Sequence, residues 1–526
     1  MKDKKPAVLS LYFAFPILIF LFSACPRGNQ GEADAGASGE GVFLTTAETP
    51  LEGGELRFGL TTEPATLDPL SPANTADGRS ILFNVFEGLV KPDTEGRFRP
   101  AAAESWTQEE GGRVYTFTLR GGLVFHDGSP VTPEDVKFTL DTAARAGFEG
   151  FARIEGVEIT GSRNIRIILG EPDPEFLPYL TVGIVQKNNT DREKKPVGTG
   201  PFMIEEYAAQ RFLTLAKNPA YWQKGIPHLD RVTFVFLADS DALLLGLRGE
   251  SIDGAGVTGS VVRQLDPARF DAVPGPSAAV QLLALNNGVK PFDDIRVRRA
   301  VNYGIDIPRI IDTAFYGEGE PSGSPLIPGL VHYYEGALKD PYPFDPAKAR
   351  SLLAEAGYGN GTAGGNTLSL EITVPSNYTM HVDTAQVVVN QLSAVGIDAT
   401  IKLVDWATWL SDVYRGRNYQ GTIISLDAVN VSPRSFLARY LSGGESNFVN
   451  FRSAEYDRVY NTALVETDEA KRINLYKEAQ RIISENAAGV YIQDIMGFTV
   501  FPKGRFRGVV NYPLHVIDLS SVYRIK

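Results

Sequence analysis

The sequence predicts an α/β protein with more than one lobe, and three observations lead to that prediction. Short segments with the alternating pattern of strands are interleaved with segments whose apolar residues recur at helical spacing. The connections are short, and no repeat of fixed period occurs. Once a short apolar leader is set aside, about 500 residues remain, which is more than one hydrophobic core usually serves.

The first elements follow from these two periods. Residues 56–60 alternate between apolar and other residues, which predicts a half-buried strand, and residues 114–119 do the same. Apolar residues within 80–90 lie at helical spacing and predict a helix. Thr132 followed by Pro133 and two acidic residues is typical of a helix start.

The middle of the chain continues as strands, one helix and turns. The predicted elements are a turn at 198–202, strands at 213–215, 232–237 and 280–285, and a helix at 241–248. The last strand ends at Asn286-Asn287-Gly288, a pattern that suits a crossover or a hinge.

The C-terminal half carries the clearest helix signals. Helices are predicted at 294–302, 345–357, 383–396, 405–414, 454–465 and 469–486, and strands at 368–374, 397–403, 422–426 and 489–493. Strand-helix-strand order with short loops implies parallel pairing and right-handed crossovers.

The N-terminus has the layout of a signal peptide over residues 1–24. Lys2, Lys4 and Lys5 precede an almost uninterrupted apolar run at 7–22. That run is shorter than the ~20 residues of a membrane-spanning helix, and Pro16 interrupts it. Cleavage is therefore favoured over a permanent anchor.

Cys25 is the only cysteine in the 526 residues and ends the stretch Phe22-Ser23-Ala24-Cys25. This stretch resembles a bacterial lipobox, which implies that Cys25 carries a lipid and becomes the mature N-terminus. The alternative is a chance cysteine behind an ordinary signal peptide. Residues 25–52 hold little apolar surface and are expected to form a flexible tether to a membrane, on its outer or periplasmic face.

The charge balance disfavours nucleic acid as a partner. The formal net charge is −12, and loss of three lysines and one aspartate with residues 1–24 leaves −14. The basic residues Arg296, Arg298 and Arg299 lie next to Asp293 and Asp294, and we expect them to form a solvated helix face.

No enzymatic motif is found. The five histidines are isolated in sequence, and no paired-cysteine or HExxH spacing offers metal ligands, so no metal or cofactor is expected. Neither a G-x-S-x-G elbow nor a phosphate loop is present. An enzyme that acts on envelope polymers remains the alternative of another class.

Six stretches stand in the order of one known family. They are Glu63–Pro69, Phe86–Val90, Tyr115–Arg120, Phe125–Val136, Gly198–Phe202 and Ile295–Tyr303. From about Gly53 to its end, the chain resembles the family-five extracellular solute-binding proteins, which are the dipeptide- and oligopeptide-binding receptors of bacterial ABC importers.

The resemblance implies a fold of the periplasmic-binding-protein-like type II class, with two lobes, three domains and a ligand cleft between the lobes. The implied parts are domain I at 53–75, 190–287 and 503–526, domain II at 76–189, and domain III, the second lobe, at 288–502. Chain crossings are expected near 286–291 and 500–503. Closure of the lobes around a ligand is then read by a membrane permease.

The resemblance also implies a function without covalent chemistry, namely capture of peptides by a monomer for an ABC permease and its ATPase. Nickel chelates and sugars are the alternative ligands on the same fold. Glu63 and Trp406 match positions at the cleft of peptide-binding members. Those members usually place an aspartate four residues before Pro433, where this chain has Val429.

Asp427 lies two residues before Val429, on the same face of an extended strand. A slipped loop would let Asp427 pair with a peptide amine; otherwise the ligand lacks a free α-amine. Asn430, in the same loop, is also expected to contact the ligand.

Overall fold

The largest element of the fold is a mixed sheet that contains eleven strands among the residues that the structure describes. The computed structural model describes residues 49–359, 366–427 and 432–525, and 49–526 forms one compact unit. The sheet order is β15 (Ile397–Val404), β14 (Leu368–Pro375), β16 (Gly421–Asp427), β12 (Phe270–Leu285), β17 (Gly489–Pro502), β11 (Gly254–Thr258), β1 (Glu55–Leu60), β10 (Arg231–Phe236), β9 (Phe212–Lys217) and β8 (Phe202–Ala208), with β13 (Gly319–Pro321) beside β17.

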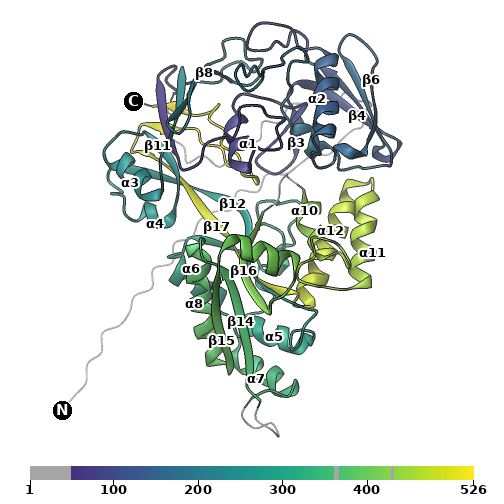
Figure 1. Ribbon diagram of the computed structural model, residues 1–526, viewed down its shortest axis with the longest axis vertical. Coiled ribbons are helices and arrows are strands. Elements are labelled where there is room, and N and C mark those ends of the chain that lie inside the picture. The colour runs from purple at the N-terminus through teal and green to yellow at the C-terminus, as the bar shows by residue number, and fades with distance from the viewer. Residues whose placement is uncertain (1–48, 360–365, 428–431, 526) are drawn as a thin grey trace, which may run out of the picture. The chain divides into compact units, whose positions relative to one another are not determined.

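Strands β12 and β17 run through the middle of this sheet (Figure 1). They pair antiparallel from Phe270 with Pro502 to Ala284 with Gly489, with a register shift between Pro276 and Val280. Both are longer than the sequence predicted, because their alternation breaks at the prolines and glycines of 274–276 and 497 although pairing continues. Strand β17 pairs with β11 near its end and with β13 before that.

The predicted parallel pairing is confirmed on two sides of the sheet. Strand β14 pairs parallel with β15, with Leu368 opposite Ile397, and helix α8 (Thr379–Ala394) connects them. Strand β1 pairs parallel with β10, with Leu56 opposite Val232. The domain bounds and the crossings at 286–291 and 500–503 stay predictions.

A second, antiparallel sheet of four strands lies beside helix α2 (Figure 1). Its order is β4 (Ala103–Glu109), β5 (Val114–Leu119), β7 (Asn164–Leu169) and β6 (Ile154–Ile159). Helix α2 (Pro133–Arg145) begins where the sequence predicts, because the Asp135 carboxylate accepts the Thr132 N–H at 3.0 Å and so satisfies a free donor at the helix end.

The remaining helices and short strands surround these sheets. They are α1 (Ala76–Leu82), α3 (Ser240–Arg248), α4 (Gly259–Val262), α5 (Ile295–Tyr303), α6 (Ile307–Ala314), α7 (Pro346–Glu355), α9 (Trp406–Thr408), α10 (Pro433–Leu437), α11 (Ala454–Val465), α12 (Glu469–Glu485), β2 (Val90–Pro92), β3 (Phe98–Pro100), β18 (Phe506–Arg507) and β19 (Tyr523–Arg524). Within the described ranges no helix combines the length and the apolar character needed to cross a membrane.

Three local predictions are wrong. Helix α1 ends at Leu82 instead of running to residue 90, because the Asn84 amide donates to the carbonyls of Ile81 and Ile517, at 3.1 and 2.6 Å. Instead of a full helix at 405–414, α9 is followed by a π-helical turn at Trp409–Arg415.

The third correction concerns Arg298, which is not on a solvated helix face. It is 7% exposed, and its guanidinium donates to the carbonyls of Phe292 and Asn486 at 2.8 and 3.0 Å. The carbonyl of Asn486 lies at the C-terminal end of α12, where free acceptors attract a cation. Arg298 therefore joins α5 to α12.

Candidate ligand-binding site

A cavity of about 390 Å³ opens beside α1. Its walls come from segments far apart in the sequence, namely the loop between β1 and α1, α1 itself, the residues after α2, the loop before residue 184, the end of β16 and the C-terminal tail. The lining residues are Pro69, Pro72, Ala76, Arg79, Ser80, Leu82, Phe83, Phe86, Pro92, Ala146, Gly147, Phe148, Glu149, Phe151, Pro178, Tyr179, Thr181, Val182, Gly183, Asp427, Leu514, His515 and Val516. This volume is in the range of small-molecule sites.

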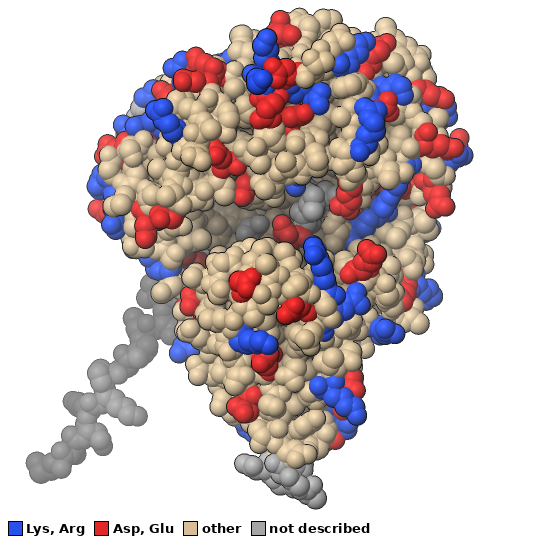
Figure 2. Space-filling view, in the orientation of Figure 1, with Lys and Arg blue, Asp and Glu red and all other residues tan. Residues whose placement is uncertain are grey.

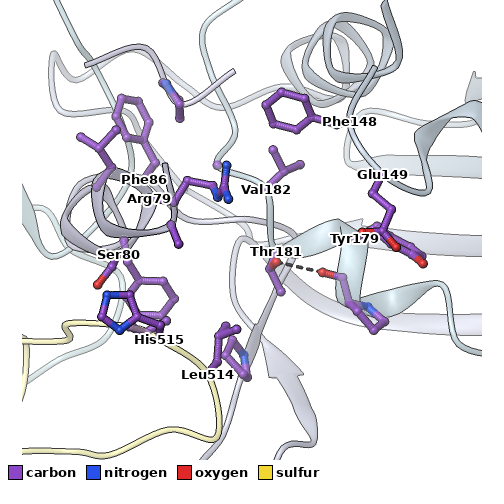
Figure 3. Close-up of a pocket in the computed structure, with 18 of the residues that line it drawn as sticks. Arg79, Ser80, Phe86, Phe148, Glu149, Tyr179, Thr181, Val182, Leu514 and His515 are labelled. Carbon is purple, nitrogen blue, oxygen red and sulfur yellow. Dashed lines mark hydrogen bonds between the residues drawn. The ribbon is translucent and has the colours of Figure 1, made fainter. Parts of the chain in front are cut away.

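Aromatic and aliphatic side chains form most of the cavity wall, and Figure 3 shows Phe86 and Phe148 on opposite sides of it. Phe86 is buried, and Phe83 packs on Tyr512 with ring centroids 6.1 Å apart. Thr181 turns its hydroxyl to the carbonyl of Pro178 at 2.9 Å, so it offers little to a ligand. The wall therefore suits a ligand with an apolar part.

Helix α1 supplies the basic side of the cavity. Arg79 points its guanidinium toward the middle of the cavity in Figure 3, and one of its N–H groups donates to the carbonyl of Asn74 at 2.7 Å. Burial lowers the pKa of Arg79. His515 at the cavity edge is paired with Asp77 at 2.8 Å, and this contact lowers the pKa of the Asp77 carboxyl against the opposing effect of burial.

Two carboxylates, Glu149 and Asp427, also line the cavity. Asp427 is the last residue of β16 and lies opposite Ala279 of β12. Its backbone carbonyl accepts an N–H of Arg439 at 2.7 Å, which holds the end of the strand in place. Its side chain is exposed.

The other residues that the sequence singled out lie elsewhere. Glu63 is half-buried and accepts hydrogen bonds from the Tyr207 hydroxyl and the Gln210 backbone, at 3.2 and 2.8 Å. It does not line the cavity beside α1. Val429, Asn430 and the lipidation candidate Cys25 lie outside the described residues.

Trp406 forms an aromatic group at the start of the π-helical turn. Its ring stacks on Trp409 with centroids 5.1 Å apart and an interplanar angle of 5°. Trp406 is 39% exposed, whereas Trp409 is buried and donates its Nε1–H to the Thr422 hydroxyl at 3.0 Å. Tyr378 meets Trp406 edge to face at 5.6 Å. Trp406 thus presents an open face on a fixed support.

Next to the cavity walls, a buried charged cluster joins the loop after β7 to helices α10 and α12. Asp173 accepts two hydrogen bonds from Arg434, at 2.8 and 3.0 Å, and pairs with Arg153. Burial alone would raise the pKa of Asp173, but Arg434 and then Arg153 bring it below its ordinary value.

Glu175 is the second acid of this cluster. Its carboxylate accepts a hydrogen bond from the Tyr476 hydroxyl and lies 4.0 Å from the Nε atoms of both Arg434 and Arg472. Burial raises the pKa of Glu175 despite these contacts. Such a cluster is costly to break, because each charge would then remain buried without a partner.

The sequence contains no signal for this cluster and only a weak one for the α1 side of the cavity. Both arise from segments brought together only by the fold, and neither forms a spaced motif. The weak signal for the cavity is Arg79, a charged residue directly before the predicted helix at 80–90. In the part of the chain that the structure describes, no group of three His, Cys, Asp or Glu residues is arranged to hold a metal ion.

Figure 2 shows a hollow across one face of the protein, bordered by both acidic and basic side chains. The large mixed sheet and the cavity lined by residues from distant segments fit a protein of the type II periplasmic-binding class. Residues 97–448 match the family profile described as bacterial extracellular solute-binding proteins, family 5 Middle. The chain belongs to this family.

Curated relatives extend the match over most of the chain. The heme-binding protein A of Haemophilus influenzae is 27% identical over 490 residues, which cover 84% of this chain and 88% of the relative. The glutathione-binding protein GsiB of Shigella flexneri is 27% identical over 478 residues, which cover 84% and 91%.

Solved structures share the fold. The substrate-binding protein CtaP of Listeria monocytogenes superposes with a TM-score of 0.80 at 22% identity, over 90% of this chain and all of that one. The periplasmic binding protein DppA of Helicobacter pylori, in complex with the peptide STSA, has a TM-score of 0.70 at 25% identity, over 90% and 99%.

Proposed function

We propose that this protein is the solute receptor of an ABC importer and that it captures short peptides in the cavity beside α1. The observation that carries the proposal is the convergence of α1, the loop at 178–183 and the end of β16 on one cavity of small-molecule size. A peptide fits the chemistry of the lining, since apolar walls accept side chains while charged groups at separate places accept its ends.

Two relatives support a peptide-like solute. GsiB is named for glutathione, and DppA was solved with a four-residue peptide. We place the amine of the ligand at Asp427, whose exposed carboxylate ends β16. Trp406 offers a flat surface to a side chain, and Glu63, Val429 and Asn430 complete the residues that we assign to ligand binding. Trp406 and Glu63 do not line the cavity beside α1, so we assign them to parts of the ligand that extend beyond it.

We further propose that residues 1–24 are removed, that Cys25 carries a lipid and that the receptor works as a monomer at the cell envelope. Residues 25–52 then tether it near a membrane permease. Transport follows from closure on the ligand, because a permease that binds only the closed form responds to the population that the ligand shifts.

The test is a thermal-shift screen of the mature protein with Cys25→Ser against di- to pentapeptides, N-acetylated peptides, nickel chelates and oligosaccharides. A ligand that binds only the folded state raises the melting temperature. We expect stabilisation by free peptides that is lost on acetylation and in Asp427→Ala. Asp398→Ala, at an exposed position of β15, is the matched control. Stabilisation by chelates or sugars alone would overturn the peptide assignment.

A further inference from the structure

The buried charged cluster lies between two parts of the protein that have separate hydrophobic cores. The four-stranded sheet packs through Phe117 and Phe176 in one core, and helices α10 to α12 pack through Phe436 and Tyr456 in another (Figure 1). Among the described residues Phe98, which is half-buried, packs against both cores. The two parts therefore meet largely outside their apolar cores.

Each side of the cluster is fixed to its own part of the fold. The Asp173 N–H donates to the Gly112 carbonyl at 3.1 Å, and the Asp173 carbonyl accepts the Tyr115 hydroxyl at 2.5 Å. The backbone of Asp173 is thus held by the four-stranded sheet. On the other side, the carbonyl of Arg434 accepts the hydroxyl of Tyr460 in α11 at 3.3 Å. A rotation of one part against the other would act directly on the pair of Asp173 and Arg434.

The charges are shielded from water where the two parts meet. The side chains of Asp173, Glu175, Arg434 and Arg472 are 4, 7, 10 and 10% exposed. The two acids follow β7, whereas the two arginines lie in α10 and α12. Separation of the two parts would hydrate all four charges.

A contact made of charges can be opened at a lower cost than an apolar one. The attraction within a buried ion pair is largely offset by the cost of removing both charges from water, and hydration returns on separation. Exposure of apolar surface has no such compensation. Asp173 also keeps Arg153, which lies directly before β6 on its own side of the contact. The open form therefore leaves no acid without a counter-charge or water.

The same contact determines how two walls of the cavity beside α1 are placed. Arg434 lies shortly after Asp427 in the sequence, and Asp173 lies shortly before Tyr179. Asp427 and Tyr179 both line the cavity. When the pair of Asp173 and Arg434 is formed, it fixes the spacing between these two walls.

We propose that the cluster around Asp173 and Arg434 is a latch, which holds α10 and α12 against the four-stranded sheet when no ligand is bound. The latch breaks when the receptor opens to admit a solute, and it forms again as the receptor closes. Arg434 is then a positioning residue, because it acts on the cavity through the placement of Asp427. The inference rests on the proposed function in that the cavity is taken as the ligand site.

Distances between two spin labels, measured by pulsed electron paramagnetic resonance, test the latch. The mature protein with Cys25→Ser has no other cysteine, so the labels attach only where cysteines are introduced. Thr160→Cys after β6 and Asn461→Cys on α11, both at exposed positions, report on the separation of the two parts. Thr160→Cys combined with Glu109→Cys on β4 reports on the four-stranded sheet alone.

Without ligand, the labelled protein is expected to show one short distance across the contact. Arg434→Met removes a partner of Asp173 in the closed form only, so the ratio of open to closed forms should rise about 100-fold and add a longer distance. Arg434→Lys keeps the charge but not the two-bond geometry, and it should give a smaller share of the longer distance. Arg481→Met, whose pair with Glu335 does not involve the four-stranded sheet, should match the protein without this substitution.

The latch is overturned if Arg434→Met leaves the distances across the contact unchanged, or if the longer distance already dominates before any substitution of Arg434. A changed distance between residues 109 and 160 would mean that Arg434→Met disturbs the sheet itself. Arg434→Lys then decides: the longer distance with an unchanged sheet supports the latch, and its absence overturns it. The measurement needs no ligand, so its failure leaves the peptide assignment intact, and failure of the thermal-shift screen leaves the latch intact.

Discussion

Arg434 and Asp173 lie 261 positions apart in the sequence and form a two-bond ion pair, at 2.8 and 3.0 Å, with side chains that are 10% and 4% exposed. Arg434 belongs to α10, directly after the loop that follows β16, and Asp173 follows β7 of the four-stranded sheet. The pair therefore joins α10, which follows the cavity-lining end of β16 in the sequence, to the four-stranded sheet that contains β7.

Removal of one partner should be expensive. We expect Arg434→Met to lower the free energy of unfolding by about 3 kcal/mol, because Asp173 keeps only Arg153 as a counter-charge. Urea denaturation measures the loss. Arg481→Met is the control, since Arg481 is 44% exposed in its pair with Glu335 and this pair is expected to contribute less than about 1 kcal/mol. Equal losses in both variants would contradict the assignment.

The hydrogen bond from Tyr476 to Glu175 should make a contribution to the free energy of unfolding that depends on pH. Burial raises the pKa of Glu175, so the ionised carboxylate lowers the free energy of unfolding at neutral pH. This cost disappears as the pH falls and Glu175 becomes protonated. Tyr476→Phe removes a contact that opposes this shift, and we expect a loss of about 1–2 kcal/mol at pH 7.5 that shrinks toward pH 5. Tyr460→Phe loses a bond to the neutral carbonyl of Arg434, so its cost should not depend on pH. Parallel pH curves for the two variants would refute the explanation.

His381 should make the protein sensitive to acid. Burial lowers its pKa to about 4, whereas an unfolded chain holds it near ~6.5. Because the neutral form is favoured in the fold, stability is full above pH ~6.5 and is lost as the pH falls toward 4, by about 3 kcal/mol. Urea unfolding at pH 7.5 and 4.5 should show a smaller drop in His381→Gln. His332→Gln, with its ring near the surface against Glu95, should keep the drop of the wild type.

Substitutions of the two stacked tryptophans should have different effects, one on stability and the other on ligand binding. Trp409→Ala is expected to cost about 3–5 kcal/mol because it leaves a cavity in the core. Trp406→Ala, at 39% exposure, should cost about 1 kcal/mol and instead weaken peptides with bulky side chains. Calorimetry with peptides that differ in one side chain gives the second readout, and an unchanged preference among them would exclude Trp406 from the site.

The glycines of the stretch at 198–202 should be required by packing. A Cβ at Gly198 would stand 2.0 Å from the Val85 carbonyl, so Gly198→Ala is expected to cost about 2–3 kcal/mol. A Cβ at Gly156 meets no atom within 4 Å, and Gly156→Ala should change the free energy of unfolding by less than about 0.5 kcal/mol. Similar melting temperatures for both variants would rule out the close approach as the cause.

Local patterns predicted those elements that local chemistry determines. The strand at 56–60, the capped helix after Thr132 and the parallel strands around α8 all appear in the structure, because periodicity and end caps act over a few residues. The prediction of a helix from 80 to 90 was wrong, because the same spacing of apolar residues also fits a buried segment that is not helical. The Asn84 contacts favour the non-helical path after Leu82.

The site was harder to predict, for a different reason. Asp427 was identified from the resemblance, as the acidic residue two positions before Val429, and it lines the cavity. Arg79 and Ser80 were not identified, because α1 joins the other segments of the cavity wall only in the folded protein. The pairing of Arg434 with Asp173 joins residues that no pattern of spacing connects.

The sheet narrows where β12 and β17 pass between its two halves. At Pro276 and Met496 they pair only with each other among the described strands, next to the facing glycines Gly275 and Gly497. A bend at this point breaks no bond to a third strand. We expect closure on a ligand to bend the chain at this point, and substitutions of side chains elsewhere to shift the balance between open and closed forms without changing the pairing of the sheet.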